Sequence, residues 1–297
     1  MLIGATTREA GELPPAIRSR CAEIYFEPLT PQHIEEIVAN AGEKLKVKMT
    51  PPVPKLISEY TIEGRKAINL LADAYSAALY REGSAKKKLT ITEDDVYRVF
   101  QVSRLTPYVS MKASETTEIG KIFGLGVAGY LGSVLEIEAM AFPNADKGKG
   151  TIRFNDTAGS MAKDSVFNAA AVVRKVTGED IHNYDLHVNI IGGGRIDGPS
   201  AGVAILAAII SAITGRPIRQ DVAVTGEVSI QGKVKAVGGV FEKAYGAKQA
   251  GMSDIIIPRE NEKDIPENHL GLTIHPVDTV EAALNLLFTD HTNRASA

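Results

Sequence analysis

The stretch Asp197-Gly198-Pro199-Ser200-Ala201-Gly202 decides the fold of the second half of the chain, because it predicts a serine at the start of a buried helix. A strand-like segment (187–191) and three glycines (192–194) precede it, and an apolar run (203–213) follows. Proline suits a first helical turn, where its missing N–H would not be used. Unpaired N–H groups and the helix dipole at that position favour developing negative charge. Ser200 is therefore either a nucleophile beside an anion-stabilising turn or an ordinary N-cap serine.

A second element, further along the chain, offers a candidate base. Residues 225–237 read as two strands joined by a Gln231-Gly232 turn. The pattern of residues 240–250 then predicts a helix. Lys243 lies on its first turns among apolar residues, where burial would lower the pKa of the amine and let it accept a proton. A serine with a lysine base is a known catalytic pair, and a solvated helix lysine is the alternative.

Three motifs together resemble the proteolytic domain of the Lon family of ATP-dependent proteases. They are Asp197-Gly198-Pro199-Ser200-Ala201-Gly202, Thr225-Gly226-Glu227 and Gly238-Gly239-Val240-Phe241-Glu242-Lys243. The resemblance covers roughly Ile122 to Thr289. It implies that Ser200 is the nucleophile and Lys243 the general base, and the family's spacing selects Lys243 over Lys233 and Lys235.

The same resemblance implies supporting residues around this dyad. Thr225 would hold the lysine by a hydrogen bond, and Glu227 matches a position near the dyad. Glu138 matches an acidic position beside the site. We expect Asp197 to fix the loop or the substrate backbone rather than replace the lysine as base. The oxyanion hole would be formed by backbone N–H groups around Gly198, Ser200 and Ala201.

Two features before the serine loop depart from the family pattern. His187 falls where some members carry the first of two histidines before the serine loop. Asn189 stands where the second would be, and the loop 192–196 is one residue short of that pattern. The departures match a subfamily with a shorter loop and leave the role of His187 open.

The first residues are similar to the end of an AAA+ ATPase core. Two short apolar segments, 2–7 and 22–26, are predicted strands. By this resemblance Thr6 or Thr7 would sense the γ-phosphate, and Arg20 would belong to an arginine-finger segment that offsets transition-state charge. The alternative is that Arg20 is a surface arginine at a strand entry.

Residues 28–103 read as helical and resemble an AAA+ lid. Thr30-Pro31 provides a cap and a first-turn proline, and apolar residues recur at helical spacing behind it. A shorter helix around Leu56, one from Gly64 to about Tyr80 and a last one from about Ile91 follow. Arg65 matches the lid arginine that acts as sensor 2.

A nucleotide pocket is incomplete in this sequence. No Gly-x-x-x-x-Gly-Lys-Ser/Thr segment, the loop that cradles phosphates, occurs anywhere in the chain. We expect no cofactor to be bound by this chain alone, whereas the resemblance implies ATP and Mg²⁺ for the full-length family. No metal site is predicted. The chain is interpreted as the carboxy-terminal part of a longer protein, with a naturally motor-less relative as the alternative.

Composition narrows the classes of protein and partner. With 297 residues, 44% apolar and 23% charged, the chain can bury two separate cores. A net charge of −3 provides no argument for nucleic acid or an anionic membrane as partner. One cysteine excludes an internal disulfide and fits a reducing compartment. The longest apolar run is too short to span a bilayer and no secretory signal is visible, so a cytoplasmic location is expected.

The predicted fold class is α/β, with a small all-α AAA+ lid domain followed by an α/β Lon-type proteolytic domain with a mixed sheet. The predicted segments are a remnant of the AAA+ core (1–27), the lid (28–103), the proteolytic domain (104–290) and a tail (291–297). Residues 99–107 are the expected linker between the lid and the proteolytic domain.

The predicted function is a serine endopeptidase that uses the Ser200–Lys243 dyad. The resemblance implies unfolded or damaged proteins as substrates, a homohexameric ring and a role in protein quality control. A contrasting hypothesis is a non-proteolytic module that assembles through its AAA+ remnant. A clamp-loader or branch-migration motor fragment would use only residues 1–103 and leaves the serine loop unexplained.

Overall fold

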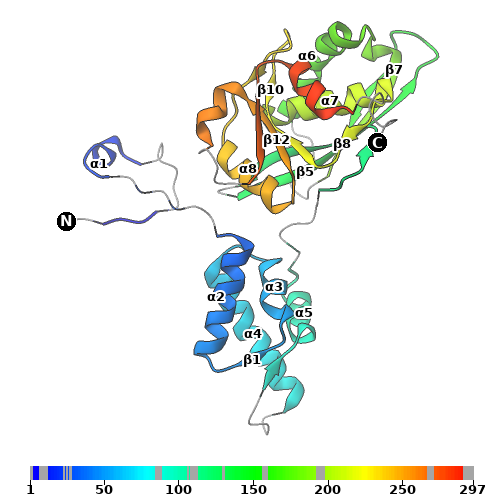
Figure 1. Cartoon of the computed structure of the whole chain (residues 1–297). Helices are drawn as coiled ribbons and strands as arrows, with labels where there is room; N and C mark the ends of the chain where they lie inside the picture. Colours follow the sequence, from blue (N-terminus) through cyan, green and yellow to red (C-terminus); the bar gives the residue numbers. More distant parts are fainter. Residues whose placement is uncertain are drawn as a thin grey trace, which may run out of the picture. The chain divides into compact units, whose positions relative to one another are not determined.

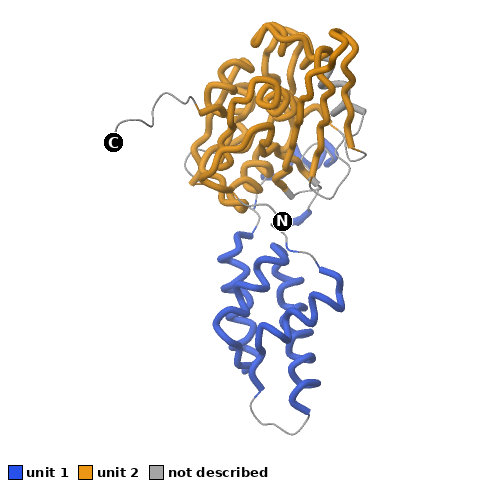
Figure 2. Tube along the Cα trace, turned by 90° about the vertical axis from the view of Figure 1, so that its right-hand side faces the viewer, with its two compact units in different colours: residues 1–110 blue, residues 111–297 orange. Residues whose placement is uncertain are grey.

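The chain divides into two units, residues 1–110 and 111–297, which Figure 2 colours separately. A computed structural model describes residues 3–6, 13–22, 24, 26, 29–83, 89–105, 107, 113–128, 131–155, 160–191, 198–265 and 271–289. Asp197, Thr7 and the predicted tail therefore lie outside the described residues. Within these ranges, no helix is both long and apolar enough to cross a lipid bilayer.

The first unit is built mainly from helices. They are α1 (Pro15–Arg18), α2 (Pro31–Lys44), α3 (Pro52–Ser58), α4 (Gly64–Glu82) and α5 (Glu93–Val102), with a short parallel pair of strands, β1 (Lys48–Met49) and β2 (Thr90–Ile91). Figure 1 shows α2 to α5 packed side by side. Each of α2 and α5 begins at a threonine in a capping box, Thr30 with His33 and Thr92 with Asp95. The cluster that α2 to α5 bury includes Ile34, Ile57 and Leu71, each at most 1% exposed.

The two strands predicted near the amino terminus do not form over the described positions. Residues 3–6 and residues 22, 24 and 26 lie outside helices and strands. Ile24 and Phe26 are 79% and 91% exposed. A strand needs a hydrogen-bonding neighbour to be stable, and none of the described strands pairs with these segments. The expected linker is also shorter at its start, because α5 continues to Val102.

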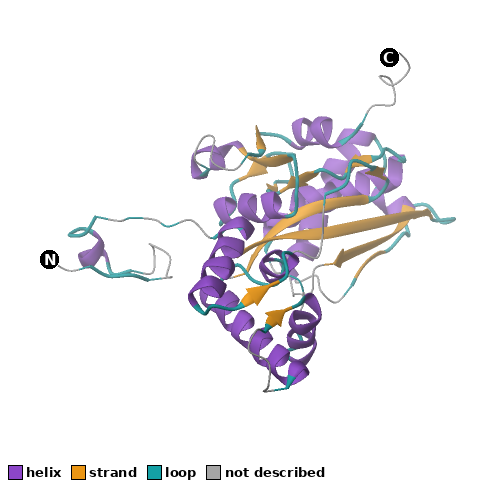
Figure 3. Cartoon of the chain, turned by 60° about the horizontal axis from the view of Figure 1, so that its bottom comes forward, coloured by secondary structure: helices purple, strands orange, loops and turns teal. Residues whose placement is uncertain are grey.

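The second unit is an α/β domain with a mixed sheet, as the sequence predicted, and helices cover both faces of the sheet (Figure 3). Its described strands are ordered β13-β12-β9-β4-β5-β7-β6. Their bounds are β4 (Lys121–Ala128), β5 (Leu131–Pro143), β6 (Ile152–Phe154), β7 (Tyr184–Ile191), β9 (Val222–Val224), β12 (Asp254–Pro258) and β13 (Thr273–Val277). Strands β13, β12, β9 and β4 run parallel, β5 is antiparallel to both β4 and β7, and β6 is parallel to β7. The strand and helix colours of Figure 3 show the sheet between its helices.

Four helices and several short elements complete this unit. They are α6 (Ser160–Thr177), α7 (Gly202–Thr214), α8 (Val240–Gln249) and α9 (Val280–Leu287), the short pairs β3 (Thr117–Glu118) with β8 (Ile218–Arg219) and β10 (Glu227–Val228) with β11 (Val234–Lys235), and the 3₁₀ turns η2 (Ile181–Asn183), η3 (Pro199–Ala201) and η4 (Arg259–Asp264).

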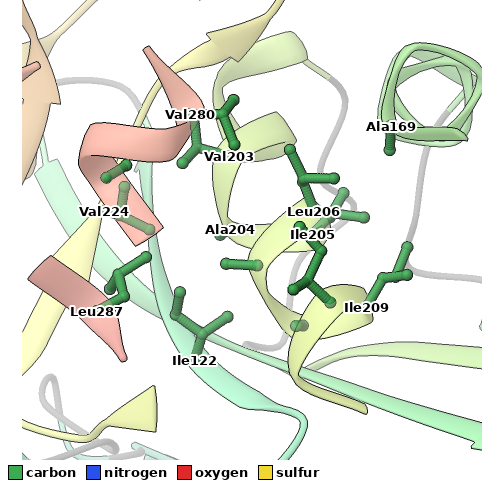
Figure 4. Packing of buried hydrophobic residues seen from close by; sticks show 14 of the residues in the cluster. Ile122, Ala169, Val203, Ala204, Ile205, Leu206, Ile209, Val224, Val280 and Leu287 are labelled. Carbon is green, nitrogen blue, oxygen red and sulfur yellow. The ribbon is translucent and has the colours of Figure 1, made fainter. Parts of the chain in front are cut away.

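Helix α7 is buried all round and forms the centre of the core. Val203 to Ile209 are at most 1% exposed, because α6, α9 and the sheet enclose them. Figure 4 shows Leu206 and Ile209 of α7 between Ala169 of α6 and Ile122 of β4. A helix that is apolar on every side is stable only when buried in this way. The residue before it, Ala201, is fixed by that packing, so the preceding serine has a rigid support.

Candidate active site

A surface pocket brings Ser200 and Lys243 together. Its lining residues are Val127, Pro199, Ser200, Ala236, Val237, Gly238 and Lys243. Val127 lies near the end of β4, and the segment that follows β9 is hydrogen-bonded to Ser200, so the pocket lies at the carboxyl ends of two parallel strands. The predicted nucleophile and the predicted base come from helices on opposite faces of the sheet. They converge at the carboxyl ends of its inner strands β4 and β9. The rest of the lining is mostly apolar.

Ser200 lies in the turn η3 that leads directly into α7, as the sequence predicted. Pro199 occupies the first position of η3, and Gly198 before it is extended, with φ of 174°. The N-cap position of α7 is Ala201 rather than Ser200. The alternative of an ordinary N-cap serine is therefore wrong, because the cap positions of η3 and α7 are Gly198 and Ala201 and Ser200 lies inside the turn.

The main chain of Ser200 is fixed by the segment after β9. The Gly226 N–H donates to the Ser200 carbonyl oxygen at 2.9 Å, and the Val203 N–H donates to the Gly226 oxygen at 3.1 Å. Gly226 has φ of +157°, and a Cβ atom there would lie 2.7 Å from Val234 Cγ1. Only glycine tolerates this φ value together with so close a contact. The position of Ser200 therefore depends on a glycine at position 226.

Thr225 supports the serine rather than the lysine. Its side chain is fully buried, and its hydroxyl donates to the Ser200 carbonyl oxygen at 3.3 Å. The predicted hydrogen bond from this residue to the lysine is not the one the structure shows, because Thr225 Oγ1 points to the turn that carries the nucleophile. Glu227 begins β10 opposite Lys235 and is half-buried. Its role near the dyad stays a prediction.

Lys243 is a buried lysine with a lowered pKa. Its side chain is 3% exposed, on the first turns of α8. Burial lowers the pKa of the amine to about 8, and the negative charge of Glu242 opposes the shift only in part. Among the described residues, no carboxylate lies within salt-bridge distance of the Lys243 ammonium group. The lysine ion pairs of the second unit involve Lys121, Lys149, Lys175 and Lys235 instead. A fraction of the amine is thus neutral near physiological pH, and a general base acts in its neutral form.

Helix α8 is seated against the β4–β5 hairpin through glycines. A Cβ atom at Gly246 would lie 2.6 Å from the Gly132 carbonyl group on β5. Gly239 precedes the helix with φ of +64°, and a Cβ atom there would lie 2.8 Å from Val127 Cγ2. The absence of side chains at these contacts brings Lys243 close to the strand that forms one wall of the pocket.

Glu138 does not line this pocket, and its place beside the dyad stays a prediction. In the β4–β5 register Glu138 pairs with Lys121, whereas Val127 of the pocket pairs with Gly132. Six residues of strand separate the two positions, about 20 Å at the usual rise per residue. The Glu138 carboxylate accepts a hydrogen bond from Asn189 Nδ2 at 3.1 Å.

His187 is also away from the pocket. It is exposed on β7 opposite Met140, further along β5 than Glu138. Its ring lies edge-on to Phe142, with ring centroids 5.9 Å apart. The two side chains pack on an exposed part of the sheet, and neither lines the pocket of the dyad.

The residues that the AAA+ resemblance assigns to nucleotide binding do not form a nucleotide site by themselves. Thr6, Arg20 and Arg65 are exposed, and Arg65 lies on the first turn of α4. The chain lacks the phosphate loop, and the expectation that it binds no ATP or Mg²⁺ alone stays a prediction. Across the described ranges, no group of three or more His, Cys, Asp or Glu side chains is arranged to hold a metal ion.

Sequence reasoning missed the walls of the pocket and what holds them. Val127, Ala236 and Val237 are apolar residues at strand ends, a pattern that reads as ordinary core. Asn261, which binds the main chain of Val237, lies in the polar run Arg259-Glu260-Asn261-Glu262, which reads as a solvated loop. A buried asparagine inside such a run has no signal in a single sequence.

The fold and the pocket define an α/β protein with a serine and a buried lysine at one edge of a mixed sheet. Residues 90–290 match the C-terminal proteolytic domain of Lon protease. The chain belongs to the Lon protease family.

Three relatives illustrate the extent of the similarity. The chain is 38% identical to Lon protease 2 of Bacillus subtilis over 96% of its own length and 53% of that protein. It is 35% identical to the archaeal Lon protease of Pyrococcus abyssi, over 94% of the chain and 32% of the relative. It is 40% identical to the archaeal Lon protease of Thermococcus kodakarensis, over 60% of the chain and 29% of that protein. The chain therefore spans about half or less of the length of these relatives.

Proposed function

We propose that the chain is a serine endopeptidase in which Ser200 is the nucleophile and Lys243 the general base. The single observation that carries the proposal is the pocket that both residues line, with the amine buried and its pKa lowered to about 8. The family and the names of the relatives support peptide-bond hydrolysis as the reaction.

The chemistry follows from the two side chains. The neutral Lys243 amine takes the proton of the Ser200 hydroxyl as its oxygen attacks the scissile carbonyl carbon. The C–N bond then breaks, the ammonium group returns the proton to the leaving amine, and an acyl ester remains on Ser200. Water hydrolyses this ester with Lys243 again as base. Backbone N–H groups around Gly198, Ser200 and Ala201 would stabilise the oxyanion, each worth about 3–4 kcal/mol when well placed.

The proposal also covers the substrates, the oligomeric assembly and the cellular location of the protein. The family resemblance favours unfolded or damaged proteins as substrates and a role in protein quality control. A homohexamer, with the helical unit acting as an AAA+ lid and Arg65 and Arg20 contributing to nucleotide binding in a ring, is the assembly that the family resemblance favours. ATP and Mg²⁺ would act only in a protein that also carries the phosphate loop. The single cysteine favours a reducing compartment, the cytoplasm.

The test is hydrolysis of an unstructured fluorogenic peptide without ATP. We expect wild-type activity to fall at least about a thousandfold in Ser200→Ala and in Lys243→Met. Lys248→Met is the matched control, because Lys248 is an exposed lysine on the same helix. Folded Ser200→Ala and Lys243→Met proteins that cleave at the wild-type rate would reject the dyad. Absence of cleavage by the wild-type chain together with assembly into a defined oligomer would favour the non-proteolytic module instead.

A further inference from the structure

The wall of the pocket opposite Ser200 is a short segment outside the seven-stranded sheet. Residues 236–238 connect β11 to α8, and all three line the pocket. Strand β11 pairs with β10 over two residue pairs, and its Val234 N–H also donates to the Asp278 carbonyl oxygen at 3.0 Å. Neither contact includes residues 236–238. The segment that leads into the lysine helix therefore has little support from strand pairing.

A buried asparagine from another element binds this segment. The Asn261 side chain, on η4, accepts from the Val237 N–H with Oδ1 at 3.0 Å and donates from Nδ2 to the Val237 carbonyl oxygen at 3.0 Å. Asn261 is 6% exposed. Its amide thus satisfies both main-chain polar groups of one residue, as a neighbouring strand would do.

The remaining bonding capacity of Asn261 is also used. Nδ2 donates to Asp264 Oδ2 at 2.6 Å, which fixes the orientation of the amide. Glu260, the residue before Asn261, accepts from the Lys235 ammonium at 3.2 Å and from the Ala236 N–H at 3.4 Å. A buried amide costs free energy unless its hydrogen bonds are made, so this residue is held in one arrangement.

Asn261 connects the pocket wall to the rigid part of the unit. Turn η4 follows β12 directly, and β12 is paired on both sides, with β9 and β13. Strand β9 leads to Thr225 and Gly226, which hold Ser200. The same sheet therefore supports the nucleophile from one side and, through Asn261, the wall beside Lys243 from the other.

We propose that Asn261 is a positioning residue of the active site: it fixes Val237, and through it the segment 236–238, against the pocket that holds Ser200 and Lys243. This inference rests on the proposed peptidase function. Asn261 touches neither the nucleophile nor the base, and acts through the main chain of Val237. A fixed wall keeps the pocket closed around the amine and keeps water away from it.

The experiment compares the full chain with Asn261→Ala, Asn261→Asp and the control Glu262→Gln, a neighbouring residue on η4 whose carboxylate pairs only loosely with Arg259 at 3.6 Å. Two readouts are taken: hydrogen exchange of the amides of residues 235–239, and the pH dependence of kcat/KM for an unstructured fluorogenic peptide. Asn261→Asp keeps the volume and an acceptor for the Val237 N–H but loses the donor, so it serves if Asn261→Ala does not fold.

We expect faster amide exchange at Val237 in both Asn261 variants, a fall in kcat/KM of about tenfold, and a rise of about half a unit in the pH midpoint as water reaches the amine. Glu262→Gln should leave the amide exchange at Val237, the kcat/KM and the pH midpoint unchanged. Unchanged exchange at Val237, or faster exchange with wild-type kcat/KM and midpoint, overturns the inference while the proposed function stands. A wild-type chain that cleaves no faster than Ser200→Ala overturns the proposed function, and the positioning role with it.

Discussion

Gly132 on β5 lies against the main chain of Glu242 on α8, so closely that a Cβ atom at position 132 would overlap the Glu242 carbonyl oxygen. The neighbouring Lys243 nitrogen would lie 2.9 Å from the same atom. Strand and helix therefore meet backbone to backbone at the residue that carries the proposed base. Any side chain at position 132 would push the first turn of α8 away from the hairpin.

Gly132→Ala is expected to reduce both stability and activity. The methyl group has no space, so the overpacking costs about 1–3 kcal/mol and displaces Lys243. Gly251→Ala is the comparison: Gly251 has φ of +76° and nothing within 4 Å of an added Cβ, so it loses about 1 kcal/mol from strain and keeps its activity. Urea unfolding and peptide hydrolysis measure the two effects. Wild-type activity in Gly132→Ala would show that the contact does not position the lysine.

Lys243→Met is expected to stabilise the protein at neutral pH. The pKa of the amine is about 8 in the folded chain against 10.5 for an ordinary lysine, so the unfolded state binds more protons between these values and the wild type becomes more stable as pH rises through that window. Below pH 8 the full cost of burying the charge remains. The variant should exceed the wild type by about 1–3 kcal/mol at pH 7 and by clearly less at pH 9.5. Urea unfolding at both pH values checks this, and an advantage that is the same at both, or absent, would contradict the buried, uncompensated amine.

Thr225→Val is expected to lower activity with a modest loss of stability. The substitution keeps the buried shape but removes the hydroxyl that donates to the Ser200 carbonyl oxygen. A hydrogen bond of this kind contributes about 0.5–1.5 kcal/mol. Thr225→Ser retains the hydroxyl and should recover most of the kcat of the wild type. Equal kcat values for the valine and serine variants would mean that this bond does not hold the nucleophile.

Glu138→Gln is expected to retain peptide hydrolysis within about twofold, because Glu138 does not line the pocket and lies six residues of strand, about 20 Å, from Gly132, the strand partner of Val127. The amide can still accept from Asn189, so folding should be preserved. Steady-state kinetics with the fluorogenic peptide provide the measurement. A loss as large as that of Ser200→Ala would place Glu138 in the active site.

Much of the fold could be predicted because the local patterns are strong. The apolar run 203–213 after Ser200 matches α7 to within a residue at each end. Glycines at 202 and 215 bound this run, and its burial agrees with its apolar composition. The dyad itself was predicted from its motifs, and the pocket holds both residues.

The errors arose where the answer depends on partners distant in the sequence. Ile24 and Phe26 have the pattern of a strand but are exposed, since no described strand pairs with them. The position of Glu138 along β5 depends on the register with β4, which motif matching does not contain. The bond of Thr225 to Ser200 and the hold of Asn261 on Val237 depend on side-chain direction after folding.

The most direct test of the dyad is the titration of Lys243 by NMR of ¹³C-labelled lysine, with the signal assigned by its absence in Lys243→Arg. Peptide hydrolysis is measured over the same pH range and in the same buffer. We predict that the Lys243 signal titrates with a midpoint of about 8 and that kcat/KM rises to a plateau with the same midpoint. A Lys243 signal that titrates near 10.5, or an activity midpoint that does not follow it, would contradict Lys243 as the base.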